Sequence, residues 1–176
     1  MGYLFIKGGA GPSGPSGPPA FVAVASSQNA TAEATATVTI PAHSSGDLLV
    51  VIISSTEDAA SPMPAWLTPS GWTAGPTAAA GNFSAVRVTS FVKEGNGSET
   101  TVAISMSSGN AEWAAACAAY SGADTTSPID QQGTTVQESG VDIASPSVTT
   151  TEADTKVIFA YVFDDDLSTD ADHDSD

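Results

Sequence analysis

Residues 34–40 read ATATVTI, and this stretch decides the fold class. Its apolar residues Ala34, Ala36, Val38 and Ile40 alternate with three threonines. Successive side chains of a β-strand point to opposite faces, so this strand would have one apolar face and one polar face. Such alternation is typical of a half-buried strand in an antiparallel sheet.

Seven further runs rich in β-branched, aromatic or small apolar residues flank this strand, separated by Gly, Pro, Ser and Asn. They cover residues 21–26, 47–54, 84–93, 100–106, 112–121, 145–150 and 155–163. Eight short strands with turn signals between them predict an all-β fold, an antiparallel β-sandwich of jelly-roll or immunoglobulin-like type. We expect an extended N-terminal arm that reaches away from this sandwich.

Four of these runs carry more specific predictions. Runs 47–54 and 155–163 are apolar on both faces, so we expect both to be central strands. The five alanines of run 112–121 favour a helix, but tight packing between sheets would also need small residues, and we interpret the run as a strand. Run 84–93 alternates like 34–40, and Gly-Asn-Gly at 95–97 predicts a hairpin after it.

The expected core follows from the apolar positions of these strands. A charge placed there without a partner costs several kcal/mol, so Val157→Asp is expected to prevent folding. The predicted core residues are Leu49, Val51, Ile53, Val86, Val88, Ile104, Val157 and Phe159.

The chain divides into three parts by composition: an arm at 1–20, the sandwich at 21–163 and an acidic tail at 164–176. Within the arm, Gly11, Gly14 and Gly17 begin consecutive Gly-X-Y triplets. Such triplets are either a stiff polyproline-type spacer or a short collagen-like segment that registers three chains.

Four residues at the start of the arm, Tyr3, Leu4, Phe5 and Ile6, form a short apolar strand. Such a strand can add to the exposed sheet edge of a neighbouring subunit. Together with the three glycines, these residues are the predicted assembly contacts. The predicted partners are therefore other subunits, in a homo-oligomer for which a trimer is one form.

The net charge of −16, from 20 acidic and only 4 basic side chains, excludes several partners. A surface this acidic repels nucleic acid, whose binding depends on Lys and Arg. The strongest apolar run, at 48–53, is far shorter than the ~18 residues that span a membrane. The single cysteine, Cys117, lies among apolar residues and is expected to be a buried, inert thiol.

Catalytic motifs find no support in the sequence, and we expect no enzymatic activity. The only histidines are His43 and His173, and no Gly-x-Ser-x-Gly elbow accompanies them. The prolines among the glycines of residues 8–17 lack the N–H groups that a phosphate loop uses.

The acidic tail offers the one candidate cation site. Asp170, Asp172 and Asp174 alternate like the first oxygen ligands of a calcium loop, although Ser175 stands where such a loop has Gly. The other interpretation is a solvated, self-repelling tail. Calcium is the only cofactor that the sequence suggests.

Tryptophans provide the candidate for sugar binding. Trp66 and Trp72 lie in the long Pro-, Ala- and Gly-rich interval 56–83 and could form a platform for a host-surface glycan. The alternative is that they pack in the core or close one end of the sandwich. Exposure of both side chains distinguishes the two, because a sugar platform must be exposed.

The interval from about 21 to 163 resembles a β-sandwich module of tailed-phage virion proteins, prophage-encoded proteins and some bacterial surface proteins. In those proteins the module often follows Gly-Pro collagen-like stretches. Such modules usually run on into another PSGW-like turn, whereas this sequence ends at Asp176. The resemblance is carried by SSGDLLVVIIS (44–54), TPSGWT (68–73), VRVTSFVKEG (86–95), AAACAAYSGADTTSPID (114–130) and SPSVTTTEADTKVIFAYVF (145–163).

What the resemblance implies is a structural role with no catalytic set. The expected function is that of a bacteriophage virion component in the head decoration, a fibre or the tail, made in the host cytoplasm and assembled through its N-terminal arm. The alternative is a carbohydrate- or cell-surface-binding adhesin module, placed outside the cell or on its surface.

Overall fold

The computed structural model describes residues 2–9, 17–57, 64–80, 85–132 and 149–160. Within these ranges the regular secondary structure consists of β-strands, with no helix. In this part of the chain no helix is long and apolar enough to cross a membrane. The strands are β1 (Gly2–Lys7), β2 (Ala20–Glu33), β3 (Thr35–Thr39), β4 (Ser45–Glu57), β5 (Thr73–Ala80), β6 (Ala85–Asn96), β7 (Thr101–Ser105), β8 (Ala111–Ser121), β9 (Ile129–Gln132) and β10 (Thr155–Ala160).

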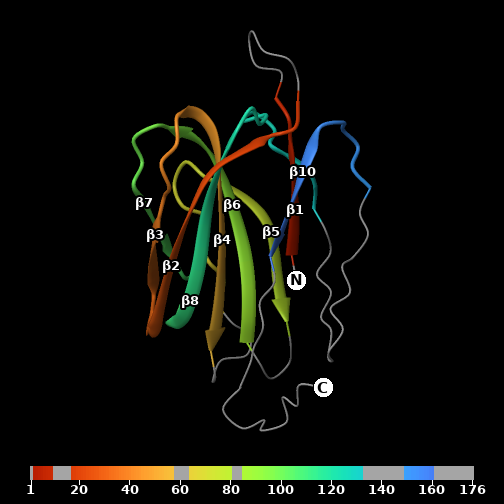
Figure 1. Cartoon of the computed structure of the whole chain (residues 1–176). Helices are drawn as coiled ribbons and strands as arrows, with labels where there is room; N and C mark the ends of the chain where they lie inside the picture. The colour runs from red at the N-terminus through yellow and green to blue at the C-terminus, as the bar shows by residue number, and fades with distance from the viewer. Residues whose placement is uncertain (1, 10–16, 58–63, 81–84, 133–148, 161–176) are drawn as a thin grey trace, which may run out of the picture.

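The strands form three sheets, and all of their pairings are antiparallel (Figure 1). The largest sheet has the order β2-β8-β4-β6-β5. The pair β3-β7 lies on one side of it, and the sheet β10-β1-β9 lies on the other side. The prediction of an all-β antiparallel sandwich is confirmed, with the five-stranded sheet as the middle layer.

The first core lies between the five-stranded sheet and the β3-β7 pair. Alternation decides its composition: Ala36 and Val38 of β3 are fully buried, while Thr35, Thr37 and Thr39 are exposed, as the sequence predicts. The small side chains of β8 let the layers approach, so its run of alanines is a strand, as predicted. Further members are Ile40, Leu49, Val51, Ile53, Trp66, Phe91, Val102, Ile104, Met106, Ala111, Trp113, Ala115, Cys117 and Ala119.

The second core lies on the opposite face of the five-stranded sheet, under β10-β1-β9. The alternate residues of β4, Leu48 and Val50, enter it together with the fully buried Ile6 of β1. Because β4 is buried on both faces, its sequence is apolar throughout, and the prediction that run 47–54 is a central strand is confirmed.

The prediction that run 155–163 is also central is wrong. Its described part, β10, is an outer strand of the three-stranded sheet, where β1 takes the central position. Ile158 packs against the second core, but Val157 points away and is 38% exposed. A short apolar run indicates a strand without fixing its place in a sheet, and here only one face of the strand is covered.

The hairpin predicted at 95–97 is also wrong, although the turn is present. Gly97 has a φ of 83°, as a Gly at such a turn requires. However, the turn leads from β6 in the middle layer to β7 in the outer pair, so these strands do not pair. Residues 88–92 of β6 are all buried, because both faces of the middle layer are covered at this strand.

Burial of the predicted core residues is confirmed for most of those that the structure describes. Leu49, Val51, Ile53, Val88 and Ile104 are at most 5% exposed. Val157 is the exception, and Val86 and Phe159 have side chains outside the described residues. Run 145–150 lies outside the described residues except for its last two positions, which are not in a strand.

Candidate functional site

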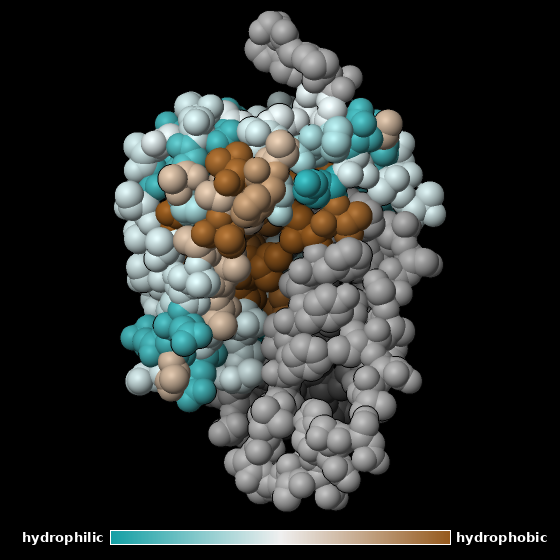
Figure 2. Space-filling model, in the orientation of Figure 1, coloured by the Kyte–Doolittle hydropathy of each residue, from teal (hydrophilic) through white to brown (hydrophobic). Residues whose placement is uncertain are grey.

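An apolar strip on β2 is the most distinctive exposed surface of the described chain. Phe21, Val22 and Val24 are 56%, 43% and 58% exposed, although large apolar side chains are normally buried. A shift in the β2–β8 register between Phe21 and Ala23 leaves Val22 as an extra residue in the strand. Figure 2 shows hydrophobic surface gathered over this part of the molecule.

Two neighbouring features make the strip a coherent surface. The ring of Phe21 packs edge-on against Tyr120 of β8, with the ring centroids 6.0 Å apart. Ala114 and Ala116 of β8 extend the exposed face with small side chains. The strip is therefore anchored to the sheet, and it offers both protruding and flat apolar contacts.

The strip also runs along an open sheet edge. β2 occupies the outer position of the five-stranded sheet and pairs with β8 on one side only. Residues 20–32 carry no charged side chain and no proline. Edge strands usually carry lysines, prolines, bulges or other devices that limit pairing with another chain. This stretch has the extra residue at Val22 but neither lysine nor proline.

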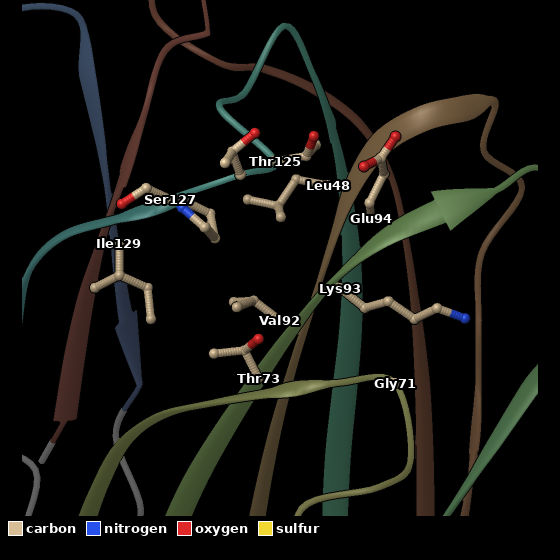
Figure 3. Close-up of a pocket in the computed structure, with 11 residues that line it drawn as sticks. Leu48, Gly71, Thr73, Val92, Lys93, Glu94, Thr125, Ser127 and Ile129 are labelled. Carbon is tan, nitrogen blue, oxygen red and sulfur yellow. The ribbon is translucent and has the colours of Figure 1, made fainter.

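A pocket of about 370 Å³ lies between the middle layer and the loop before β9 (Figure 3). Leu48, Val92 and Ile129 form its apolar lining, while Thr73 and Ser127 bring hydroxyl groups to it. The remaining lining residues are Gly71, Lys93, Glu94, Thr125, Thr126 and Pro128. Such a lining suits a small polar molecule, and its only charged residues are Lys93 and Glu94.

Local hydrogen bonds hold the loop that closes this pocket. The carboxylate of Asp124 accepts from the amides of Thr126 and Ser127, at 2.9 and 3.1 Å. The Lys7 ammonium donates to the Ser127 hydroxyl at 3.3 Å and lies 3.9 Å from Asp124. The Ser127 hydroxyl is therefore engaged by the fold, with no histidine beside it in the lining to act as its base.

Next to the pocket, three charged residues form a cluster at the end of the middle layer. Lys93 extends away from the pocket (Figure 3), and its Nζ lies 2.8 Å from Glu99 Oε1. His43 Nε2 lies 2.9 Å from Glu99 Oε2, and the His43 side chain is only 2% exposed. The cluster joins the β3–β4 loop to the β6–β7 turn.

The charge state of the cluster follows from its contacts. Burial disfavours the charged form of His43, but hydrogen bonds to the Pro41 carbonyl and to Glu99 outweigh it and raise the pKa above 6.5. Burial likewise disfavours charged Glu99, but hydrogen bonds from Lys93 and His43 lower its pKa to about 2.

This cluster is structural in its geometry. Oxygen acceptors lie 2.9 Å from both His43 nitrogens, and the more distant Gly97 amide, at 3.3 Å, also approaches Nε2. A histidine bound in this way on both sides has no nitrogen left for a substrate. The cluster therefore fixes two loops against each other.

The predicted assembly residues lie partly within the fold. Tyr3, Leu4, Phe5 and Ile6 form the central strand of β10-β1-β9, paired on both sides within the chain, rather than an arm that reaches away. Of the triplet glycines, Gly17 is described, and Gly11 and Gly14 lie outside the described residues.

The predicted sugar platform does not meet its own condition. Trp66 is only 4% exposed and its Nε1 donates to Ser55 Oγ at 3.1 Å, which makes it a core residue. Trp72 is half-buried and packs against the same core. Both tryptophans fit the alternative interpretation, in which they pack in the core.

Two further predictions concern metals and the thiol. Asp170, Asp172 and Asp174 lie outside the described residues, within which no group of three His, Cys, Asp or Glu side chains could hold a metal ion. The predicted burial of Cys117 is confirmed, and burial raises the pKa of its thiol to about 12, which disfavours the reactive thiolate.

The strip on β2 was not predicted as a functional surface, although the sequence contains a signal for it. The apolar content of residues 21–26 predicts a strand and nothing more. The additional signal is the absence of charge and proline over residues 20–32 in a chain of net charge −16. Such a neutral stretch in an acidic chain indicates a protected or a pairing edge.

Comparison of the chain with protein-family models, with curated proteins and with solved structures finds no match.

Proposed function

We propose that this protein is a structural assembly module, a bacteriophage virion component that packs against copies of itself through the apolar strip on β2. The observation that supports this most is the strip itself, with Phe21, Val22 and Val24 exposed along an unpaired, uncharged edge. The virion role comes from the sequence resemblance, and the assembly surface comes from the fold.

A second copy is the partner that the charge distribution favours. Two chains of net charge −16 repel each other over most of their surfaces. The neutral stretch 20–32 is where that repulsion is weakest. Two β2 edges can pair antiparallel around a two-fold axis, because an antiparallel strand pair is self-complementary.

The two effects that would drive this contact are separable. Pairing satisfies backbone N–H and C=O groups along an edge that has no strand partner in its own sheet. Burying Phe21, Val22 and Val24 adds hydrophobic stabilisation of about 25 cal/mol for each Å² of apolar surface removed from water. A charge at Val24 would weaken the hydrophobic effect, because side chains stand out from the faces of a sheet and Val24 would lie against the apolar side chains of the partner strand.

The test measures the mass of the full chain in solution for the wild type, Val24→Asp and Val24→Lys. We expect a dimer or larger species for the wild type and a smaller species for both variants over the same concentration range. Comparison of the Asp and Lys variants separates an effect on the contact from an effect of net charge. A positive charge at Val24 would reduce the repulsion between two acidic chains, so dissociation of the Lys variant cannot be due to repulsion. Thr37→Asp, at an exposed position of β3, is the matched control and should keep the wild-type mass.

Two results would contradict the proposal. One is a monomeric wild type up to millimolar concentration, and the other is an unchanged mass for both Val24 variants. Circular dichroism must show the same β-sheet signal for every variant, so that a change in mass is a change in assembly. The virion role is tested separately, by mass spectrometry of particles purified on a density gradient.

A further inference from the structure

The neighbours of β1 come from the far end of the chain. β1 is paired with β10 from Gly2–Ala160 to Lys7–Thr155, and on its other side with β9. Beyond the strand, the Gly8 amide donates to the Asp154 carbonyl at 3.1 Å and the Gly9 amide donates to Gly122 at 2.8 Å. Residues 2–9 therefore occupy a slot with hydrogen-bonding partners on both sides. These partners lie more than a hundred residues later in the sequence.

The slot is also a core site. Ile6 is fully buried in the second core against Leu48, Val50, Val92 and Tyr120. The strand that follows β1 in the sequence, β2, lies in the other sheet. Residues 2–9 are thus tied to their own chain through the connection at 10–19, while the slot that holds them is identical in every copy.

That connection has a sequence suited to a different path. In GPSGPSGPP (11–19), four prolines fix φ, and the residue before each one is biased toward extended backbone. As a polyproline-type spacer, the nine steps from Gly8 to Gly17 would span about 28 Å. In the structure these two glycines touch, and a Cβ on Gly8 would collide with the Gly17 carbonyl oxygen.

We propose that β1 is exchanged between copies, so that residues 2–9 of one chain fill the slot between β9 and β10 of a second chain. The exchange keeps every contact of the slot, because the incoming strand has the same sequence. In the exchanged form, the Gly-Pro connection can adopt an extended conformation between one subunit and the next. This inference rests on the proposed assembly role but uses a different surface, and it gives the Gly-X-Y triplets a place between subunits.

The energetic balance is set by the connection and by concentration. Exchange between identical slots leaves the hydrophobic and hydrogen-bond contributions unchanged, so domain swapping is a low-cost route to an oligomer. What opposes it is the effective concentration of a chain's own β1, which a short flexible linker makes high. A linker that prefers to be extended lowers that concentration, because its two ends then seldom meet.

The experiment uses two full-length chains that are produced together and carry different tags. One carries Lys7→Cys and the other carries Thr155→Cys, at directly paired positions of β1 and β10. The native Cys117 is fully buried and does not interfere. We expect oxidation to give a disulfide-linked heterodimer, several-fold more abundant than in a control mixture of Lys7→Cys with Ala160→Cys, which is paired with Gly2 instead.

A heterodimer yield no higher than in the mismatched control would overturn the proposal. A second arm replaces Pro12 and Pro15 with Ser, which makes the connection flexible without changing the slot. We expect the heterodimer yield to fall several-fold, and an equal or greater yield would also overturn the proposal. Adding Val24→Asp to both chains separates the two assembly contacts.

If the heterodimer persists in the Val24→Asp chains, strand exchange is independent of the strip on β2. If the wild type forms oligomers that Val24→Asp abolishes while no heterodimer is ever trapped, the proposed function stands and strand exchange is excluded. A chain that stays monomeric and gives no heterodimer contradicts both.

Discussion

The two cores of this molecule are built from differently distributed parts of the chain. The first core, between the middle layer and β3-β7, draws on strands from Ala36 to Ala119. The second core combines Ile6 near the N-terminus, Ile158 near the C-terminal end of the described residues and the back of the middle layer. The first core is therefore formed by the central part of the chain. The second core forms only when segments near both ends of the described chain pack against the middle layer.

This contrast shows which contacts the stability of each layer depends on. The five-stranded sheet would keep one covered face without β1, β9 and β10, because β3-β7 lies on the other side. Among the side chains that the structure describes, the apolar ones that this three-stranded sheet contributes to a core, Ile6, Ile129 and Ile158, all belong to the second core. We therefore expect the second core to open first, in a sub-global step of lower free energy than global unfolding.

The largest expected effect compares a charge placed in the first core with one placed on β10. Ile53→Asp should prevent folding, because Ile53 is fully buried and an unpaired charge there costs several kcal/mol. Val157→Asp should give a soluble, folded protein, since Val157 is 38% exposed. Circular dichroism of both variants and their urea unfolding curves check the pair, and an unfolded Val157→Asp protein would contradict the observed position of β10.

The sequence predicts the first core well and the second one poorly, for a physical reason. Alternation in residues 34–40 reports that one face of a strand is buried, and the apolar run 47–54 reports that both faces are. Neither pattern says which segment supplies the cover. The second core is covered by β1. The sequence of residues 3–6 does not distinguish pairing within the same chain from pairing with a neighbouring subunit.

The candidate surface shows the same limit. Run 21–26 predicts a strand, and β2 is one, but its place at an edge follows from long-range pairing. Trp66 and Trp72 are both large aromatic residues in a Pro-rich interval, and only the fold shows that Trp66 donates to a buried Ser55. Local pattern thus predicts the elements, and the order of strands decides which of them are exposed.

The second expected effect compares truncations in the two cores. Ile6→Ala and Ile104→Ala each remove a fully buried side chain, at a cost of about 2–5 kcal/mol. In native-state hydrogen exchange, we expect Ile6→Ala to speed exchange of the β1 and β10 amides while those of β3 and β7 change little. Ile104→Ala should speed exchange of the β1 and β10 amides and of the β3 and β7 amides alike, because loss of the first core leads to global unfolding.

Equal acceleration in both sheets by Ile6→Ala would contradict this order. The two cores would then open together as one cooperative unit, and β1 would be no easier to release than β4. That result would also raise the barrier to strand exchange, because β1 could leave its slot only by global unfolding.

The smallest expected effect belongs to the charged cluster at the edge of the middle layer, where Lys93 and Asp47 are the other charged groups near His43 and Glu99. The pKa of His43 is raised, so its contribution to stability is complete below pH 6.5 and is lost as the pH rises through the folded-state pKa. The pKa of Glu99 is lowered from 4.5 to about 2, so its contribution is present above pH 4.5 and is lost as the pH falls toward 2.

Stability from this cluster should therefore be greatest between pH 4.5 and 6.5. The size of this loss is set by the difference between the folded-state and unfolded-state pKa of His43, so we expect the free energy of unfolding to fall as His43 loses its proton, by less than the core truncations cost. Urea unfolding at pH 5, 7 and 9 measures this, and His43→Gln should flatten the decline while His173→Gln, the matched control, keeps it. Because the cluster joins loops beside the first core, the hydrogen-exchange protection factors of amides near residues 41–47 should change with pH. The protection factors of the β1 amides should not. An unchanged decline in His43→Gln, or a pH response centred on β1, would show that the charge sensitivity of the fold lies in the second core instead.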